Sequence, residues 1–314
     1  MEQRSLGSSG IHVSALSLGS WRTYERISRE QGVAVMRAAQ EVGIRFLDDA
    51  RYDDETGKAP IRTGHSEVVF GELFRAAGWK RDEVVVANKL WFEFWPAQSA
   101  ADELDGSLGR MGLDHVDLIY AERPPAGLSV EEVVAEVGGL LEAGKARAWG
   151  VLNWRADPIA EAARVAAATG TPPPCAAQLA YGLAYPQVVE EEEMSEALDA
   201  AGASVVASAV LAGGALCGKY ARGESGRLSG RLDEPRWQKA LAIGERLCVL
   251  ADELSASPSQ LAIAFALAGP RVASVLFGAT TADQVAENVA ALDVLERIAG
   301  GELEALRAVA AATV

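Results

Sequence analysis

The sequence predicts an α/β fold, a (β/α)8 barrel (TIM barrel) in which parallel strands alternate with helices. Apolar runs of strand length alternate with amphipathic stretches of helix length about every 30–40 residues. The chain of 314 residues suits one barrel of about 250 residues with insertions, so we expect a single domain over residues 1–314.

Each predicted strand is a short apolar run. These runs are residues 15–20, 44–48, 83–89, 115–121, 146–151, 175–180, 204–208 and 272–277. The stretches between them predict helices, and Ser129 followed by Glu131 and Glu132 has the pattern of a helix N-terminus. Expected helices include residues 30–42, 66–77, 97–110, 129–143, 156–168 and 187–201.

Two segments stand outside this alternation. The opening RSLGSSGIHVSAL predicts a short β-hairpin that turns between Gly7 and Gly10 and covers the amino-terminal end of the barrel. Residues 209–235 are rich in glycine and form the longest irregular stretch, which is typical of a functional lid over a binding site.

Composition excludes several classes of partner. A formal net charge of −15 disfavours nucleic acid, and no run approaches the ~18 apolar residues of a membrane span. The N-terminus lacks the apolar segment of a secretory signal, so we expect a cytoplasmic protein. Cys175, Cys217 and Cys248 have no CxxC spacing and are expected to be reduced core thiols.

Common cofactor motifs are missing. Neither GxGxxG after an early strand, nor a GxxxxGKS or GxxxxGKT loop, nor HExxH occurs. His12, His65 and His115 are dispersed along the chain, so the sequence predicts no metal site.

Four ionisable residues end three successive strand-like runs, namely Asp48, Tyr52, Lys89 and Glu122. The carboxyl ends of barrel strands meet at one mouth, so we expect these side chains around one pocket, as proton-transfer groups at a reacting oxygen. Structural alternatives are a loop cap for Asp48, a surface lysine for Lys89 and a packed rim tyrosine for Tyr52.

The chain resembles the aldo-keto reductases, and within them the branch that contains the β subunits of voltage-gated potassium channels. Over nearly its whole length it carries, in family order, GIRFLDDARYD, GHSEVVFGELF, VVVANK, VDLIYAERP, GKARAWGVLNW, AAQLAY, VLAGGALCGKY, SPSQLAIAFAL and VLFGATTADQVAENVAAL. The resemblance implies an enzyme that binds NADPH (NADP+) across the carboxyl-end rim and reduces carbonyls by hydride transfer.

The resemblance assigns cofactor contacts to three groups of residues. Those at the first turn and the nicotinamide are Gly19, Ser20, Trp21, Asn153, Gln178 and Ser208. Those of the pyrophosphate strap and long loop are Leu211, Gly213, Lys219 and Arg227. Those of the adenosine end are Gly278, Thr280, Gln284, Glu287 and Asn288.

Some of these positions depart from the family pattern. Leu152 replaces the usual Ser, which removes about one hydrogen bond, ~1 kcal/mol, and Ser208 replaces an aromatic ring. Gln284 is neutral where a phosphate preference would want an Arg, so NADPH over NADH is an inference from the resemblance, with Arg227 as support. The structural alternative for the segment GATTADQVAEN is an ordinary helix start with Thr281 as N-cap.

A carbonyl that accepts hydride becomes an alkoxide and needs a proton donor. We expect Tyr52 to be that donor, Lys89 to lower its pKa, and Asp48 to orient Lys89. Tyr52 follows Asp48 by four residues rather than the family's five, and the insertion DDETGKAPIRTG could absorb this shift.

Glu122 replaces the family's usual His, as in steroid 5β-reductases, which reduce a conjugated C=C bond. Burial would make Glu122 a neutral acid that polarises an enone, whereas attraction to Lys89 would keep it ionised. A rim carboxylate paired with Arg123 is the structural alternative.

An apolar or flat aromatic substrate is suggested by five rings in or beside the rim loops, and core packing explains them equally well. These rings are Trp21, Trp91, Phe92, Trp95 and Trp154. Reduction of an aldehyde or ketone ranks first, reduction of a conjugated C=C bond second, and a cofactor-sensing regulatory subunit third. A monomer and a homo-oligomer both remain open.

Overall fold

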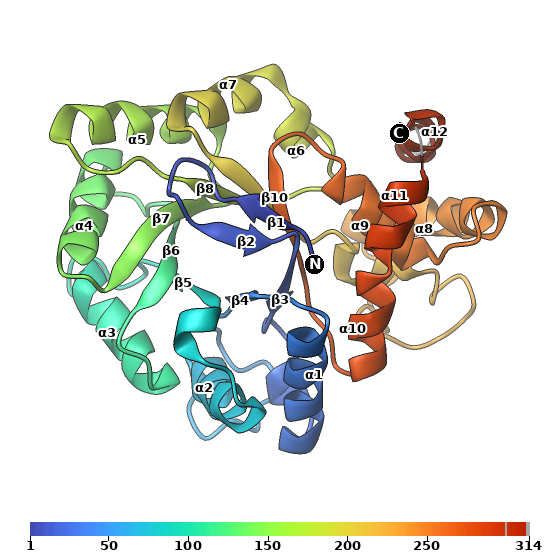
Figure 1. Cartoon of the computed structure of the whole chain (residues 1–314), viewed down its shortest axis with the longest axis horizontal. Coiled ribbons are helices and arrows are strands. Elements are labelled where there is room, and N and C mark those ends of the chain that lie inside the picture. The colour runs from blue at the N-terminus through green and yellow to red at the C-terminus, as the bar shows by residue number, and fades with distance from the viewer. Residues whose placement is uncertain (299, 312–314) are drawn as a thin grey trace.

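A computed structural model describes residues 1–298 and 300–311. Its centre is a closed barrel of parallel strands in the order β10-β3-β4-β5-β6-β7-β8-β9, with helices outside it (Figure 1). The predicted (β/α)8 barrel is therefore confirmed. The barrel strands are β3 (Leu16–Gly19), β4 (Phe46–Asp48), β5 (Val85–Leu90), β6 (Val116–Glu122), β7 (Ala146–Leu152), β8 (Ala176–Ala180), β9 (Ser204–Ser208) and β10 (Val272–Phe277).

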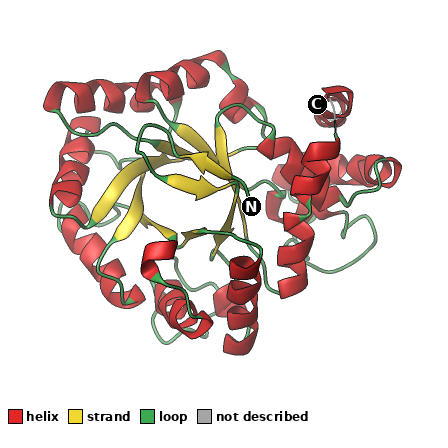
Figure 2. Ribbon diagram, in the orientation of Figure 1, coloured by secondary structure: helices red, strands yellow, loops and turns green. Residues whose placement is uncertain are grey.

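The helices surround the strands on their outer side (Figure 2). Among the described residues, four helices begin at a serine N-cap that shares a capping box with the third helical residue, and these serines are Ser28, Ser99, Ser129 and Ser257. The helices are α1 (Arg29–Glu41), α2 (His65–Ala77), α3 (Ala100–Met111), α4 (Val130–Glu142), α5 (Ala156–Thr169), α6 (Gln187–Glu190), α7 (Glu192–Ala201), α8 (Pro235–Glu253), α9 (Pro258–Leu267), α10 (Ala282–Val289), α11 (Ala291–Arg297) and α12 (Gly300–Ala311).

The end of the barrel opposite the strand carboxyl termini is closed by the N-terminal hairpin. Strands β1 (Gln3–Ser5) and β2 (His12–Ser14) pair antiparallel, as predicted. Leu6, Ile11 and Val13 are buried against side chains of the barrel interior. Gly7 has φ +52°, and a Cβ there would lie 2.2 Å from the Cys175 carbonyl oxygen, so the hairpin turn needs glycine.

The helix predicted over residues 187–201 is divided into α6 and α7, which corrects that expectation. Glu191 between them is extended (φ −66°, ψ 140°). Glu190 accepts a hydrogen bond from the Tyr181 hydroxyl (2.7 Å) and pairs with Arg307 of α12 (2.6 Å). These contacts between distant parts of the chain override a helical pattern that is continuous in the sequence.

The long irregular stretch 209–235 contains one 3-10 helix, Ala212–Cys217, and otherwise consists of turns. The 3-10 helix is kinked at Gly213 (φ 67°), a conformation that glycine adopts without strain. The stretch ends where Pro235 begins α8. It follows β9 and therefore starts at the carboxyl-end rim of the barrel, where the lid was expected.

The three cysteines are free thiols, as predicted, although only Cys175 is fully buried. Within residues 1–298 and 300–311, no helix combines the length and the apolar character that crossing a membrane requires.

Candidate active site

A buried ion pair lies at the centre of the barrel mouth. Lys89 Nζ lies 2.5 Å from Asp48 Oδ1, and each residue is only 2% exposed. Lys89 also donates to the Asp49 carbonyl oxygen (3.3 Å). Burial alone would lower the pKa of Lys89, but Asp48 and then Tyr52 outweigh it and raise that pKa, so the ammonium stays charged.

Gln178 completes the surroundings of Asp48. Its Nε2 donates to Asp48 Oδ2 (2.9 Å) from β8, on another side of the barrel. Both carboxylate oxygens are thus occupied, one by an ammonium and one by an amide. Gln178 is 3% exposed and links the predicted catalytic residues to the predicted nicotinamide contacts.

Tyr52 reaches this ion pair despite its short spacing from Asp48. The centre of its ring lies 5.5 Å from Lys89 Nζ. Its carbonyl oxygen accepts a hydrogen bond from Gly64 N (2.9 Å), and a bridge between Asp53 and Thr63 closes the insertion. Both ends of the insertion therefore lie beside Tyr52. This arrangement explains how Tyr52 reaches the ion pair although it follows Asp48 by four residues and not five.

The pKa of Tyr52 corrects one expectation. Burial raises the pKa of the phenol, Lys89 lowers it as predicted, and Asp48 and Asp49 raise it again. Burial outweighs the ammonium, so the net pKa lies above the usual value for tyrosine rather than below it. Tyr52 is consequently protonated across the neutral range, the form that a proton donor needs.

Glu122 is the last residue of β6 and is partly buried. Burial raises the pKa of its carboxyl group, while the Arg123 backbone N–H (3.0 Å from Oε1), the Arg123 charge and Lys89 oppose the rise. The Arg123 guanidinium donates instead to the Asn153 carbonyl oxygen (3.3 Å). The direction of the shift makes this carboxyl group easier to protonate than an exposed glutamate.

Two of the five predicted pocket rings contact Tyr52. The Trp21 ring centre lies 6.5 Å from that of Tyr52, and Trp91 packs edge-on at 6.0 Å. Phe92 and Trp154 are 2% and 1% exposed and belong to the hydrophobic core, which corrects the expectation that they line the pocket. Trp95 is partly buried against the same core.

The predicted nicotinamide and first-turn contacts lie at the strand ends. Gly19 ends β3, and Ser208 ends β9. The buried Ser20 hydroxyl donates to Asp49 Oδ1. Asn153 follows β7 in a left-handed conformation (φ 56°), and its N–H donates to the Gln178 carbonyl oxygen (3.0 Å).

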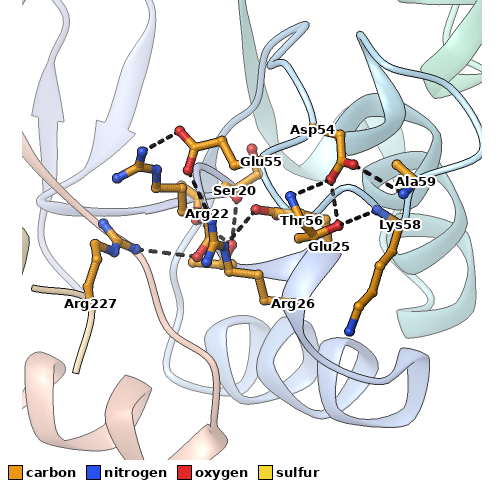
Figure 3. A network of polar contacts seen from close by, with 12 residues as sticks. Ser20, Arg22, Glu25, Arg26, Asp54, Glu55, Thr56, Lys58, Ala59 and Arg227 are labelled. Atoms are coloured by element: carbon orange, nitrogen blue, oxygen red, sulfur yellow. Dashed lines mark hydrogen bonds and ion pairs between the residues drawn. The ribbon is translucent and has the colours of Figure 1, made fainter. Parts of the chain in front are cut away.

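The long loop reaches across the rim to the segment after β3 (Figure 3). Arg227 donates to the Arg22 carbonyl oxygen (3.3 Å), and its guanidinium lies 5.5 Å from the Trp21 ring centre. Glu55 of the insertion pairs with Arg22 and with Arg26 (3.0 Å). Burial, then Arg22 and Arg26, lower the pKa of Arg227.

The other strap residues, Leu211, Gly213 and Lys219, belong to the same loop, and Leu211 packs partly buried against the core. A Cβ at Gly214 would lie 3.8 Å from Lys219 Nζ, so the Lys219 ammonium lies close to the backbone of the loop at Gly214.

The predicted adenosine contacts gather after β10. Thr281 is the N-cap of α10, as the structural alternative proposed. Gln284 Oε1 accepts from Thr280 N (2.8 Å) and Thr280 Oγ1 (3.1 Å). Glu287 accepts from the Ser257 hydroxyl (3.1 Å). Gly278 precedes this helix, and Asn288 near its end is 5% exposed.

Sequence reasoning missed Asp49 and His65. Asp49 is fully buried, and burial followed by Glu67 raises its pKa well above the usual value. His65 begins α2 and lines a small hollow with Tyr52 and Trp21. The doublet of Asp48 and Asp49 was a signal in the sequence, because adjacent residues at the end of a strand point in different directions: Asp48 pairs with Lys89, and Asp49 accepts from Ser20.

No group of three or more His, Cys, Asp or Glu side chains is placed to hold a metal ion within residues 1–298 and 300–311.

Comparison with known proteins agrees with this geometry. The sequence model of the Aldo/keto reductase family matches residues 15–309. A relative from Oryza sativa subsp. japonica, named as a voltage-gated potassium channel subunit beta, is 32% identical over 328 aligned positions, which cover 98% of this chain and 96% of the relative.

A relative from Schizosaccharomyces pombe with the same designation is 32% identical over 316 positions, which cover 94% of this chain and 89% of the relative. The predicted resemblance to this branch is confirmed. Membership supports oxidoreductase activity, since the family generally uses NAD(P)H and acts on small carbonyl compounds. The chain belongs to the aldo/keto reductase family.

Proposed function

We propose that this protein reduces the carbonyl group of an aldehyde or ketone with hydride from NADPH. The observation that carries the proposal is the arrangement of Tyr52, Lys89 and Asp48 at the barrel mouth, where a proton donor faces a buried ammonium. Glycine-rich turns and cationic side chains along the same rim are of the kind that a dinucleotide needs.

The rim fits a dinucleotide with phosphate groups. Burial, and then the charges of Arg22 and Arg26, lower the pKa of Arg227, so an anion beside it would stabilise its charged form. Gly278 packs directly on the segment after β3, since an added Cβ would lie 2.8 Å from Thr23 Cγ2, so the residues proposed for the two ends of the cofactor belong to adjoining segments.

Three sets of residues would hold the cofactor. Gly19, Ser20, Trp21, Asn153, Gln178 and Ser208 would surround the nicotinamide; Leu211, Gly213, Lys219 and Arg227 the phosphates; and Gly278, Thr280, Gln284, Glu287 and Asn288 the adenosine. A preference for NADPH over NADH is part of the proposal and rests on Arg227.

When bound, NADPH supplies the hydride. Tyr52 donates its phenolic proton to the substrate oxygen as negative charge develops there. Lys89 stabilises the phenolate that remains, and its charge acts in a poorly solvated site where electrostatic interactions are strong. Asp48 holds the Lys89 ammonium in place, and Gln178 in turn holds the Asp48 carboxylate. Little reorganisation of these groups is therefore needed during the reaction.

A specific observation favours a second candidate, reduction of a conjugated C=C bond. Burial raises the pKa of Glu122, so its carboxyl group tends toward the neutral form that donates a hydrogen bond to an enone oxygen. Such a bond draws electron density away from the β-carbon and favours hydride addition there.

A third candidate, a cofactor-sensing regulatory subunit with little turnover, is favoured by the names of both relatives. One experiment separates the three. NADPH oxidation is followed with aldehydes, ketones and enones, and the products are identified by NMR. Alcohols support the first function and saturated ketones the second, whereas tight NADPH binding without consumption supports the third.

A further inference from the structure

A buried ion pair joins the segment that carries Tyr52 to a helix on the neighbouring side of the mouth. Arg51 precedes Tyr52, and its guanidinium lies 3.2 Å from Glu103 Oε1 on α3. Arg51 is 9% exposed and Glu103 only 4%. Neither charge can be solvated in place, so each depends on the other and on nearby hydrogen bonds.

The Glu103 carboxylate also holds the turn after β5. Oε1 accepts a hydrogen bond from Trp91 N (3.0 Å), and Oε2 accepts one from Phe92 N (3.1 Å). Phe92 has φ +55°, a left-handed conformation that costs an ordinary residue free energy and must be imposed by its surroundings. Glu103 therefore fixes the backbone that carries Trp91.

Arg51 contacts the same turn at two further points. It pairs with Glu93 (3.0 Å), and its guanidinium lies 5.5 Å from the Phe94 ring centre. The Trp91 ring, which the same turn carries, packs edge-on against the Tyr52 ring, with the ring centres 6.0 Å apart. One guanidinium thus ties together the two segments whose rings meet at the mouth.

We propose that Arg51 is a positioning residue, which through Glu103 sets where Trp91 lies against Tyr52 and so determines the fit of aromatic carbonyl substrates. The inference rests on the proposed function, in which Tyr52 is the proton donor. Loss of Arg51 would leave the Glu103 carboxylate buried without a cation. That carboxylate would then draw in water and loosen its hold on the Trp91 and Phe92 amides.

The test compares Arg51→Met and Arg51→Lys with Arg29→Met. Arg29 is the matched control, since it pairs with Glu72 (2.7 Å) on the exposed surface between α1 and α2. We expect Arg51→Met to raise KM for an aromatic aldehyde about tenfold, with kcat and the KM for propanal within about twofold. Arg51→Lys retains the charge and should restore most of the affinity, and Arg29→Met should change neither KM.

A second measurement reports on Trp91 without turnover. The protein is labelled with 5-fluorotryptophan, and the Trp91 signal in the ¹⁹F spectrum is identified by its loss in Trp91→Phe. We expect Arg51→Met to shift or broaden this signal and Arg29→Met to leave it in place. Thermal unfolding of each variant shows whether it is folded. If Arg51→Met is not folded, Arg51→Lys is used in its place, and we expect a small shift of the Trp91 signal and a small rise in KM for the aromatic aldehyde alone.

An unchanged Trp91 signal in Arg51→Met, or in Arg51→Lys where Arg51→Met is not folded, would overturn the inference, and so would equal changes in KM for both aldehydes. If no carbonyl compound is turned over at all, the proposed function fails instead. The ¹⁹F comparison then still decides whether Arg51 positions Trp91.

Discussion

The ammonium nitrogen of Lys89 lies 5.5 Å from the centre of the Tyr52 ring, on the carboxyl-end face of the barrel. Two segments that are far apart in the sequence thus bring together a cation and a phenol. The cation is held by Asp48 and the phenol is partly buried, and this pairing makes the proposed proton transfer testable residue by residue.

Replacing Lys89 with Met should lower kcat for aldehyde reduction by about 10²–10⁴-fold, the usual range for loss of acid–base assistance. The phenolate that forms in the transition state would lose its cation, and Asp48 would be left buried without its counterion. Single-turnover kinetics measure the rate. NADPH affinity, measured by fluorescence, should stay within about threefold; a loss of binding that accounted for the lost rate would contradict the assignment.

The pH dependence of reduction follows from the raised pKa of Tyr52. The reaction needs the protonated phenol, so kcat should stay level through the neutral range and fall only above the ordinary tyrosine value of about 10. Because Lys89 lowers this pKa, Lys89→Met should move the fall to still higher pH. A fall in kcat between pH 7 and 9 in the parent enzyme would argue against Tyr52 as the donor.

Glu122→His should change the ratio of products from an enone. Removing the carboxyl group, whose pKa burial raises, should reduce the yield of saturated ketone and increase that of allylic alcohol. The conjugate reduction should also weaken as pH rises and the Glu122 proton is lost. NMR of the products gives the ratio, and a ratio that is the same in both enzymes rules out this role for Glu122.

Trp91→Ala should raise KM for a large aromatic aldehyde by about tenfold, which corresponds to ~1.4 kcal/mol of lost contact. A small aldehyde does not span from Tyr52 to this ring, so its KM should stay within about twofold. Steady-state kinetics with both substrates measure the difference. Equal effects on the two would mean that Trp91 packs the rim and does not recognise the substrate.

The sequence predicted the barrel because short, mainly apolar runs alternate with stretches of helix length. The run Val85–Leu90 is buried throughout, including the polar Asn88 and Lys89, and buried runs separated by helical stretches are typical of parallel sheets. The predicted strands over 44–48 and 83–89 were slightly misplaced, since β4 begins only at Phe46 and the 3-10 helix Arg81–Glu83 occupies the start of the second run.

Other features depend on contacts that are distant in sequence. Nothing local distinguishes Trp154, which is 1% exposed in the core, from Trp21, which is 48% exposed at the rim, because each lies two residues after the end of a barrel strand. Arg51 and Glu103 are separated by 52 positions, and only the folded barrel brings them into contact. The sequence supplied the predicted catalytic residues and the role of Asp48, whereas the contact of Gln178 with Asp48 and the pairing of Arg51 with Glu103 became visible only in three dimensions.

The most direct measurement is the single-turnover rate of hydride transfer to an aldehyde, at saturating NADPH, for the parent protein and Tyr52→Phe. We expect a rate at least about 100-fold lower for Tyr52→Phe with unchanged NADPH affinity, because the variant keeps the ring but loses the phenolic proton. Equal rates in the two proteins would contradict it.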